Sequence, residues 1–404
     1  MRRWVESLEQ FAIDVILERR YGKRASLLRV FLFALSLLFT GLVQLRLWLF
    51  RKRFLRNRPL GCIVVSVGNL TVGGTGKTPV VERLARTLQQ NGRRVAILSR
   101  GYKSRRPPLL KRLHGRLTGR INESIPRVVS NGEHVLLGSR EAGDEPYMLA
   151  SNLPGVVVLV DKDRVKCGRY AVERFGADTL ILDDGLQYLH LQHRLDLVLV
   201  DRQAPFGNEY LLPRGTLREP PRNLCRASYV IITKSEGADN TELIARIRRY
   251  NRTAEIIEST HRPRHLQEVS TGKWLPLDAL KGAYVGAFSA IAAPESFEAA
   301  LRGLGAHVEL SRRFIDHHRF TEQEIRSFAA RCRRRDVSMI LTTEKDAVRF
   351  PRKLSLEVPV YLLRVEIDIL KGEESWQRCI DSICRPGPLV RPGTPLTPAI
   401  VPAG

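Results

Sequence analysis

The sequence is poor in acidic residues and in cysteine. Its 42 acids stand against 66 lysine and arginine residues, a formal net charge of +24. The six cysteines form no Cys-x-x-Cys pair and no metal-ligand spacing, so reduced thiols in a cytosolic compartment are expected rather than a cysteine-bound metal. We find no internal repeat. The uncharged run from residue 30 to 43 has fourteen residues, short of the ~20 that a membrane-spanning helix requires.

The positive charge is concentrated in two stretches. Residues 93–127 hold eleven basic residues against one acid, and residues 1–58 hold thirteen against four. Such blocks attract polyanions: nucleic acid, an anionic membrane surface or a phosphorylated substrate. Binding to single-stranded nucleic acid uses aromatic residues among the basic ones, and residues 93–127 contain only Tyr102. We therefore expect a membrane surface as a partner, and no nucleic acid.

The N-terminal region has an apolar segment, residues 27–50, followed by a basic cluster. The segment starts too far along the chain for a signal peptide, and no small-residue cleavage site follows it. A buried core helix is one interpretation. The tryptophan near its end and the cations beyond favour a membrane-associated helix. The pattern leaves open whether the helix spans the bilayer or lies in its interface.

Beyond residue 60, apolar runs alternate with helical patterns such as residues 80–90 and 168–175. Several runs are apolar throughout, which is typical of strands buried on both faces of a parallel sheet. The expected strands of this region are residues 63–67, 95–99, 156–160, 180–183, 197–200 and 230–233. The pattern predicts an α/β fold with a doubly wound, mostly parallel sheet.

A similar alternation resumes near residue 283 and predicts a second, smaller α/β domain. The expected divisions are a membrane-associated helical segment with a basic flank (1–58), a P-loop core domain (59–240), a loop-rich connection (241–282), the smaller domain (283–384) and a proline-rich, disordered tail (385–404).

A glycine-rich turn joins the first expected strand to the first helix. It ends in Gly73-Gly74-Thr75-Gly76-Lys77-Thr78, as a P-loop does, although the pattern GxxxxGK[ST] would require glycine where Thr71 stands. The alternative is a flexible turn with an incidental Gly-Lys-Thr. The strand before and the helix after favour a phosphate cradle, in which backbone N–H groups and the lysine hold a nucleoside triphosphate and the threonine hydroxyl binds Mg²⁺. The expected nucleotide-binding residues are Thr71, Val72, Gly73, Gly74, Thr75, Gly76, Lys77 and Thr78.

Three further clusters contain acids or histidines. Asp183 and Asp184 end an apolar strand, where a P-loop protein holds Mg²⁺, and a solvated turn is the alternative. Asp144 and Glu145 follow a glycine, and on pattern alone Asp144 is equally well explained as a helix cap. Asp316-His317-His318 suggests a metal site or a base oriented by an acid. No other group is spaced to complete a metal site, so we favour the base.

These stretches together resemble the tetraacyldisaccharide 4′-kinases, the lipid A 4′-kinases of Gram-negative bacteria. The matching stretches occur in the family's order at residues 67–79, 99–102, 142–146, 163–164, 182–187, 212–220, 314–320 and 343–346. The chain departs from the family pattern at Tyr188, Arg214, Ala290 and Ala292, none of which belongs to the phosphate cradle.

The resemblance implies transfer of the γ-phosphate of ATP to the 4′-hydroxyl of a tetraacyldisaccharide 1-phosphate, a lipid A precursor, at the cytoplasmic face of the inner membrane. It also implies that Asp144 is the catalytic base and that His317 is its partner, which places the site between the two domains. Lys77 and the arginines Arg164 and Arg218 would balance charge on the transferring group. The expected Mg²⁺ ligands are Thr78, Asp183, Asp184 and Glu145, and which of the three carboxylates contacts the ion directly is left open.

A membrane-associated P-loop ATPase that recruits partners is the alternative function. Such a switch would hydrolyse ATP without lipid and would not need Asp144, so an acceptor assay separates the two.

Overall fold

The computed structural model describes residues 11–12, 14–101, 125–351 and 356–385. Most of the basic stretch 93–127 and all but the first residue of the predicted tail lie outside these residues. The strands are β1 (Ile63–Asn69), β2 (Val95–Ser99), β3 (Arg127–Asn131), β4 (Val157–Val160), β5 (Thr179–Asp183), β6 (Leu195–Asp201), β7 (Tyr229–Thr233), β8 (Glu255–Glu268), β9 (Trp274–Leu275), β10 (Tyr284–Ser289), β11 (His307–Arg313), β12 (Met339–Thr343) and β13 (Val360–Lys371).

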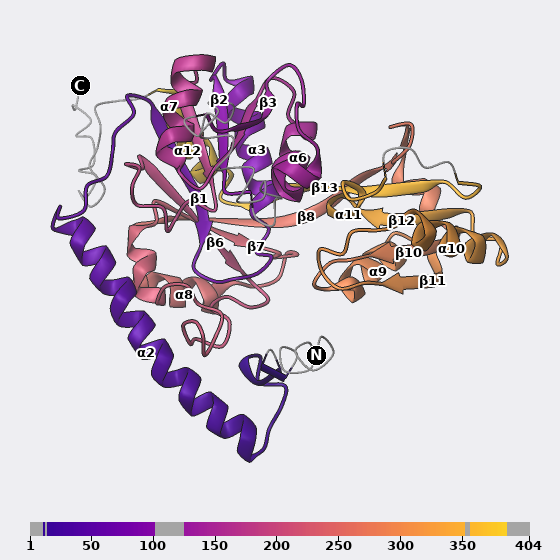
Figure 1. Cartoon of the computed structure of the whole chain (residues 1–404), viewed down its shortest axis with the longest axis horizontal. Coiled ribbons are helices and arrows are strands. Elements are labelled where there is room, and N and C mark those ends of the chain that lie inside the picture. The colour runs from indigo at the N-terminus through magenta and orange to yellow at the C-terminus, as the bar shows by residue number, and fades with distance from the viewer. Residues whose placement is uncertain (1–10, 13, 102–124, 352–355, 386–404) are drawn as a thin grey trace, which may run out of the picture.

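The helices lie between these strands or flank them (Figure 1). They are α2 (Lys23–Arg51), α3 (Lys77–Gln90), α5 (Ser139–Ala142), α6 (Asp144–Asn152), α7 (Arg164–Phe175), α8 (Thr241–Tyr250), α9 (Pro294–Gly303), α10 (Glu322–Arg333), α11 (Glu344–Ala347) and α12 (Glu373–Cys384), with short 3₁₀ helices η1 (Pro221–Arg226) and η2 (Leu277–Leu280).

All the strands join one sheet. Its order is β11-β10-β12-β13-β8-β7-β6-β1-β5-β2-β4-β3, and β9 pairs with β8. Most neighbours are parallel; the antiparallel pairs are β3 with β4, β8 with β13 and β8 with β9. The predicted doubly wound, mostly parallel α/β fold is confirmed.

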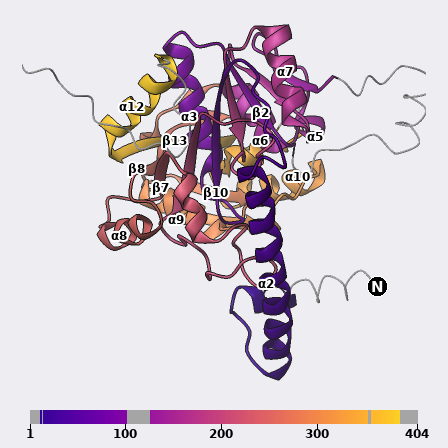
Figure 2. The same ribbon diagram turned by 90° about the vertical axis from the view of Figure 1, so that its left-hand side faces the viewer.

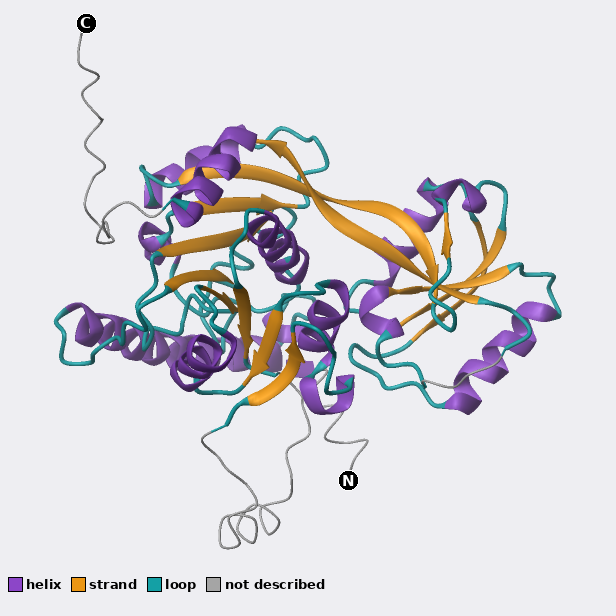
Figure 3. Ribbon diagram, turned by 90° about the horizontal axis from the view of Figure 1, so that it is seen from above, coloured by secondary structure: helices purple, strands orange, loops and turns teal. Residues whose placement is uncertain are grey.

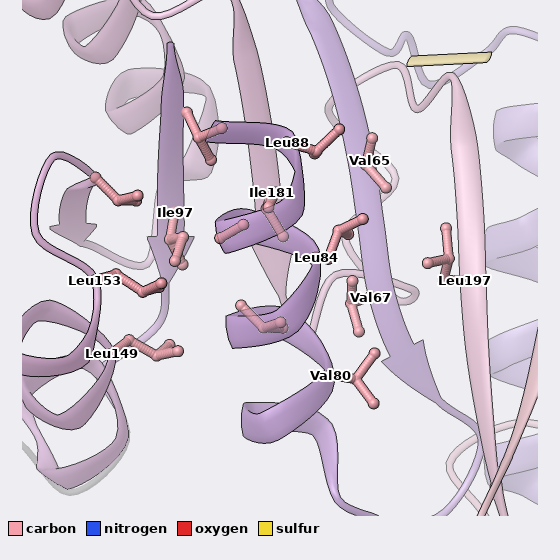
Figure 4. Close-up of a cluster of buried hydrophobic side chains, with 14 of the residues drawn as sticks. Val65, Val67, Val80, Leu84, Leu88, Ile97, Leu149, Leu153, Ile181 and Leu197 are labelled. Carbon is pink, nitrogen blue, oxygen red and sulfur yellow. The ribbon is translucent and has the colours of Figure 1, made fainter. Parts of the chain in front are cut away.

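The first unit, the P-loop core that contains β1, α3 and α7, is built around β1, whose seven residues are all buried. Alternate side chains of a strand point to opposite faces, so β1 serves two cores. On one face, α3 packs against the sheet through residues spaced four apart, Val80, Leu84 and Leu88, as Figure 4 shows. On the other face, Val64 lies in the cluster that includes residues of α7.

The long strands β8 and β13 run side by side from the first unit to the second (Figure 3). The expectation of a loop-rich connection at 241–282 is therefore wrong, because this region contains α8, β8, β9 and η2. The first half of β8 meets a core on each face, through Ile256 and Ile257, but much of its second half is partly exposed. Its sequence is consequently polar and lacks the apolar run by which the other strands were recognised.

Helix α12 also differs from expectation, since the sequence placed it with the smaller domain. Its buried residues Trp376, Cys379, Ile380 and Ile383 belong to the same hydrophobic cluster as α3 and β1. The chain returns along β13 and completes the core of the first unit. The second unit therefore ends within β13 rather than at residue 384.

Helix α2 lies along one side of the first unit and extends away from it (Figures 1 and 2). It has 29 residues, and its length and composition suffice for a membrane crossing. Only 6% of its most apolar 18-residue window is buried. It contacts the core through the Phe33–Tyr210 ring pair, through Phe39 and through a hydrogen bond from Gln44 to Asn223.

We predict that Gly68→Ala destabilises the fold. A Cβ added at Gly68 would lie 2.7 Å from Cβ and 2.9 Å from the backbone nitrogen of Leu186, so β1 and the loop after β5 would have to separate. Overpacking of this kind costs roughly 1–3 kcal/mol, which should lower the melting temperature by several degrees. Gly303→Ala is the control, because its Cβ would meet nothing within 4 Å. Equal melting temperatures for the two variants would contradict the prediction.

Candidate active site

The phosphate-binding turn predicted at residues 71–78 lies between β1 and α3. Gly73 and Gly76 have φ angles of 119° and 79°, a region in which glycine is favoured. The turn is fixed at both ends: Val72 N–H donates to Thr216 O at 2.7 Å, and the Thr233 hydroxyl donates to Thr75 O at 3.0 Å. Lys77 donates to Asn69 Oδ1 at 3.1 Å. Strand, glycine turn and helix therefore have the geometry of an anion cradle.

The two aspartates at the end of β5 have different partners. Asp183 is buried and accepts a hydrogen bond from Ser99 Oγ at 3.0 Å. Burial and the neighbouring charge of Asp184 raise the pKa of Asp183 to about 6, and Glu145 acts in the same direction. Asp184 has Lys77 at 3.5 Å and the Arg218 Nη1 atom at 2.7 Å. Burial raises the pKa of Asp184, but these cations outweigh it and hold the pKa below its usual value.

Both arginines expected near the phosphates lie beside this acid pair. Arg218 contacts both carboxylate oxygens of Asp184, at 2.7 and 2.9 Å. Arg164 is buried at the start of α7, donates to Asp183 O at 3.4 Å and lies over the ring of Tyr188. The Tyr188 hydroxyl in turn accepts from Arg164 N–H at 3.0 Å and donates to Asp163 at 3.2 Å. Tyr188, one of the residues that depart from the family pattern, thus holds Arg164 in position.

The second part of the site surrounds Asp144, the first residue of α6. Its carboxylate has three partners, all from the second unit: His317 Nδ1 at 3.2 Å, Arg349 Nε at 2.8 Å and Arg319 Nη2 at 3.2 Å. Burial raises the pKa of Asp144, but the hydrogen bond with His317 and the two arginines outweigh it, so the pKa lies below its usual value. Asp144 is therefore held as a carboxylate.

The two neighbouring histidines have separate surroundings. His317 lies between Asp144 and Lys345, whose Nζ is 3.4 Å from His317 Nε2, and its φ of 66° is unusual for a non-glycine residue. His318 stacks on Phe314 and contacts Glu324, which also forms the capping box of α10 with Thr321. His318 thus supports the loop, whereas His317 reaches Asp144.

Glu145, the remaining acid of the predicted set, lies 3.3 Å from Lys345 Nζ. Its charge also acts on Asp183, so the α6 acids and the β5 acids belong to one neighbourhood. The structure thus brings the phosphate turn, the acid pair and the Asp144–His317 pair to one edge of the sheet.

Sequence reasoning missed Arg319, Arg349 and Lys345. Arg319 directly follows the two histidines, and Lys345 lies in a stretch used for the resemblance. Arg349 pairs locally with Asp346, but its contacts with Asp144 and Ala290 O come from distant parts of the chain, so the sequence did not connect it with the site.

A cavity of about 1020 Å³ lies between the two units beside these arginines. Tyr147 lines it from the first unit, and Arg319, Phe320, Arg349 and Phe350 line it from the second. The units therefore meet at Asp144 without packing closely over the adjoining surface.

A glycine turn between a buried strand and a helix, with acids at the neighbouring strand end, defines a P-loop nucleotide-binding protein of the α/β class. A carboxylate–histidine pair beside that acid cluster is suited to a kinase acting on a hydroxyl group.

Comparison with known proteins identifies the family. The model of the tetraacyldisaccharide-1-P 4′-kinase family matches residues 28–385, and the chain belongs to this family. The tetraacyldisaccharide 4′-kinase of Anaeromyxobacter sp. (strain K) is 40% identical over 336 residues, 82% of this chain and 84% of that protein. That of Syntrophus aciditrophicus (strain SB) is 34% identical over 378 residues, 90% and 94% of the two chains.

A solved structure agrees with this assignment. LpxK from Aquifex aeolicus, crystallised in complex with ATP, superposes with a TM-score of 0.70 at 30% identity, covering 88% of this chain and 99% of that one.

We predict that Arg349→Met destabilises the protein far more than Arg319→Met. The Arg349 side chain is fully buried between Asp144 and Asp346, and its loss leaves buried carboxylates without a partner, which costs roughly 3–5 kcal/mol. Arg319 contacts the same carboxylate but is 35% exposed, so its loss should cost about 0–1 kcal/mol. Denaturant unfolding of both variants checks this. Equal losses would mean that Asp144 does not depend on Arg349.

Proposed function

We propose that this protein transfers the γ-phosphate of ATP to the 4′-hydroxyl of a tetraacyldisaccharide 1-phosphate and so forms the 4′-phosphorylated lipid A intermediate, lipid IVA. Membership of the tetraacyldisaccharide-1-P 4′-kinase family supports the reaction. The observation that carries the assignment of the site is the contact between Asp144 and His317 at 3.2 Å, because it joins the two units beside Glu145, whose charge acts on Asp183 at the end of β5.

The residues of the phosphate turn would bind ATP. Backbone N–H groups of residues 73–78 face the phosphates in such a turn, and Lys77 would move its contact from Asp184 toward the outer phosphates. Arg164 and Arg218, which contact Asp183 and Asp184, would balance the charge of the transferring group. The relative crystallised with ATP supports this choice of nucleotide.

The oxygen groups at this edge fit Mg²⁺. Mg²⁺ prefers hard oxygen ligands and is usually bound by one or two carboxylates together with substrate phosphates. Thr78 at the start of α3 and Asp183 at the end of β5 would hold the ion, and Glu145 is close enough to act on Asp183. Asp184 is already engaged by Lys77 and Arg218, so a supporting role suits it better. When bound, Mg²⁺ neutralises charge on the phosphates.

Asp144 would accept the hydrogen bond of the sugar hydroxyl. Its lowered pKa makes it a weak base, yet phosphoryl transfer passes through a loose transition state in which the hydroxyl proton leaves late. A carboxylate that is fully ionised and fixed by three cationic or hydrogen-bonding neighbours is suited to orienting that hydroxyl. His317 would hold Asp144 in place and stabilise it as the proton arrives.

Helix α2 would bring the site to its lipid substrate at the cytoplasmic face of the inner membrane. Large apolar side chains along it are exposed, among them Leu27, Val30, Phe31, Leu38 and Trp48. Basic residues follow at 51–58, and such a cluster is attracted to anionic lipid headgroups. The anionic membrane surface is therefore the second partner that we propose.

We predict that Lys77→Ala and Thr78→Ala each lower kcat/KM more than about a hundredfold, because each removes a contact to phosphate or Mg²⁺. The assay follows label from γ-labelled ATP to detergent-solubilised tetraacyldisaccharide 1-phosphate. Gln90→Ala, an exposed change at the far end of α3, is the control and should keep full activity. Label released as free phosphate at the same rate with or without lipid would instead support an ATPase switch.

We predict that Asp144→Asn and His317→Ala both lower kcat strongly, leave the KM for ATP nearly unchanged and are not additive. The two side chains contact each other, so losing either removes most of what the pair contributes. Steady-state kinetics of both single variants and the double variant measure this. Fully multiplicative losses would show that the residues act independently, and a raised KM for ATP would assign Asp144 to nucleotide binding.

A further inference from the structure

In the stretch Thr343-Glu344-Lys345-Asp346, Lys345 differs from the other three residues because its contacts are with Glu145, Asp316 and His317. The Thr343 hydroxyl donates to Asp346 Oδ2 at 2.7 Å and accepts from Asp346 N–H at 3.2 Å, which caps α11. Asp346 also accepts from Ala290 N–H at 3.0 Å. Glu344 contacts Arg364 and Asn152. Thr343, Glu344 and Asp346 thus hold α11 in place, and the Lys345 side chain extends from this helix.

Lys345 points toward the catalytic pair. Its side chain is 31% exposed, and Nζ lies 3.4 Å from His317 Nε2, 3.3 Å from Glu145 and 3.7 Å from Asp316. It is therefore placed against the edge of the imidazole that faces away from Asp144.

The imidazole of His317 has conflicting neighbours at its other nitrogen. Asp144 Oδ2, an acceptor, lies 3.2 Å from Nδ1 and requires a proton there. Arg349 Nη2, which can only donate, lies 3.3 Å from the same Nδ1 and favours a lone pair there. Charged groups near the ring among the described residues include Asp144 and Glu145 from α6, Asp316 and Arg319 from the loop before α10, Lys345 from α11, and Arg349 just after it. Asp316 Oδ2 also faces Nε2 but lies 3.9 Å away, whereas Lys345 Nζ lies 3.4 Å away, so Lys345 is the nearer of the two.

Resting on the proposed function, we propose that Lys345 is a positioning residue that holds His317 in the tautomer with its proton on Nδ1. An ammonium group only donates, so its contact with Nε2 is favourable only when Nε2 carries the lone pair. The proton then lies on Nδ1 and is donated to Asp144. Lys345 thereby favours the tautomer in which Nδ1 donates to Asp144 over the tautomer in which Nδ1 accepts from Arg349.

Loss of Lys345 has a defined chemical result. The proton can move to Nε2, Nδ1 then accepts from Arg349, and the lone pair on Nδ1 faces the Asp144 carboxylate. His317 no longer donates to Asp144, although both side chains remain. The loss should match that of one hydrogen bond to a charged group, roughly tenfold in kcat.

The test compares Lys345→Met in two backgrounds. In the otherwise unchanged full-length protein, kcat should fall roughly tenfold while the KM for MgATP stays constant. In the His317→Ala background, the same change should have no further effect. Lys345→Arg should restore much of the activity, because arginine also only donates. Lys281→Met, which removes an exposed lysine paired with Asp278, is the matched control and should change nothing.

A second measurement reads the tautomer without catalysis. In protein labelled with ¹⁵N-histidine, and with His317→Ala used to assign its signals, the His317 nitrogens at a fixed pH should exchange donor and acceptor shifts in Lys345→Met. The proposal would be overturned if Lys345→Met lowered kcat just as much in the His317→Ala background, or if the ¹⁵N shifts of His317 stayed unchanged. A raised KM for MgATP would also overturn it, because that result would point to Glu145 instead. If wild-type protein labels no lipid, the proposed function fails, whereas the shifts still decide the role of Lys345.

Discussion

The buried carboxylate of Asp144 is the constraint on which the junction of the two units depends. A charge in such a position is stable only when it is paired and hydrogen-bonded, and α6 provides no cation for it. All three of its partners, His317, Arg319 and Arg349, come from the second unit. The pairs that neutralise Asp144 therefore also hold the second unit against the first, and they include the Asp144–His317 pair that we propose for catalysis.

A second buried ion network reinforces this junction. Arg364 on β13 contacts Glu82 on α3 and Glu344 on α11, and Asn152 at the end of α6 contacts both acids. Helix α3 carries the phosphate turn at its start, and α11 carries Lys345. The helix that follows the phosphate turn and the helix that carries Lys345 are thus joined by one network of buried charges.

The sequence predicted best what depends on local physics. Strand β1, the glycine turn and α3 were recognised because apolar runs, glycines and the helical spacing of Val80, Leu84 and Leu88 are local signals. The prediction from sequence failed where an element is largely exposed, and where it packs into a core formed by distant parts of the chain. Strands β8 and β11 are polar because much of their surface is exposed, and α12 packs into a core that it shares with α3, more than 280 residues before it in the chain. The Asp144–His317 contact joins positions 173 residues apart, which only the family resemblance suggested.

The pairing of β8 with β13 has a consequence for how the second unit is attached to the first. The chain leaves the first unit on β8 and returns on its antiparallel neighbour, and Val269 N–H donates to Val360 O at 2.9 Å where the two strands reach the second unit. The chain between these two residues thus begins and ends at nearly one point, the arrangement of a module inserted into a hairpin. The histidine and both arginines that contact Asp144 lie within this inserted module. The phosphate turn and Asp144 itself lie in the chain before β8. A single excursion of the chain between one pair of hydrogen-bonded strands therefore brings these three side chains to Asp144.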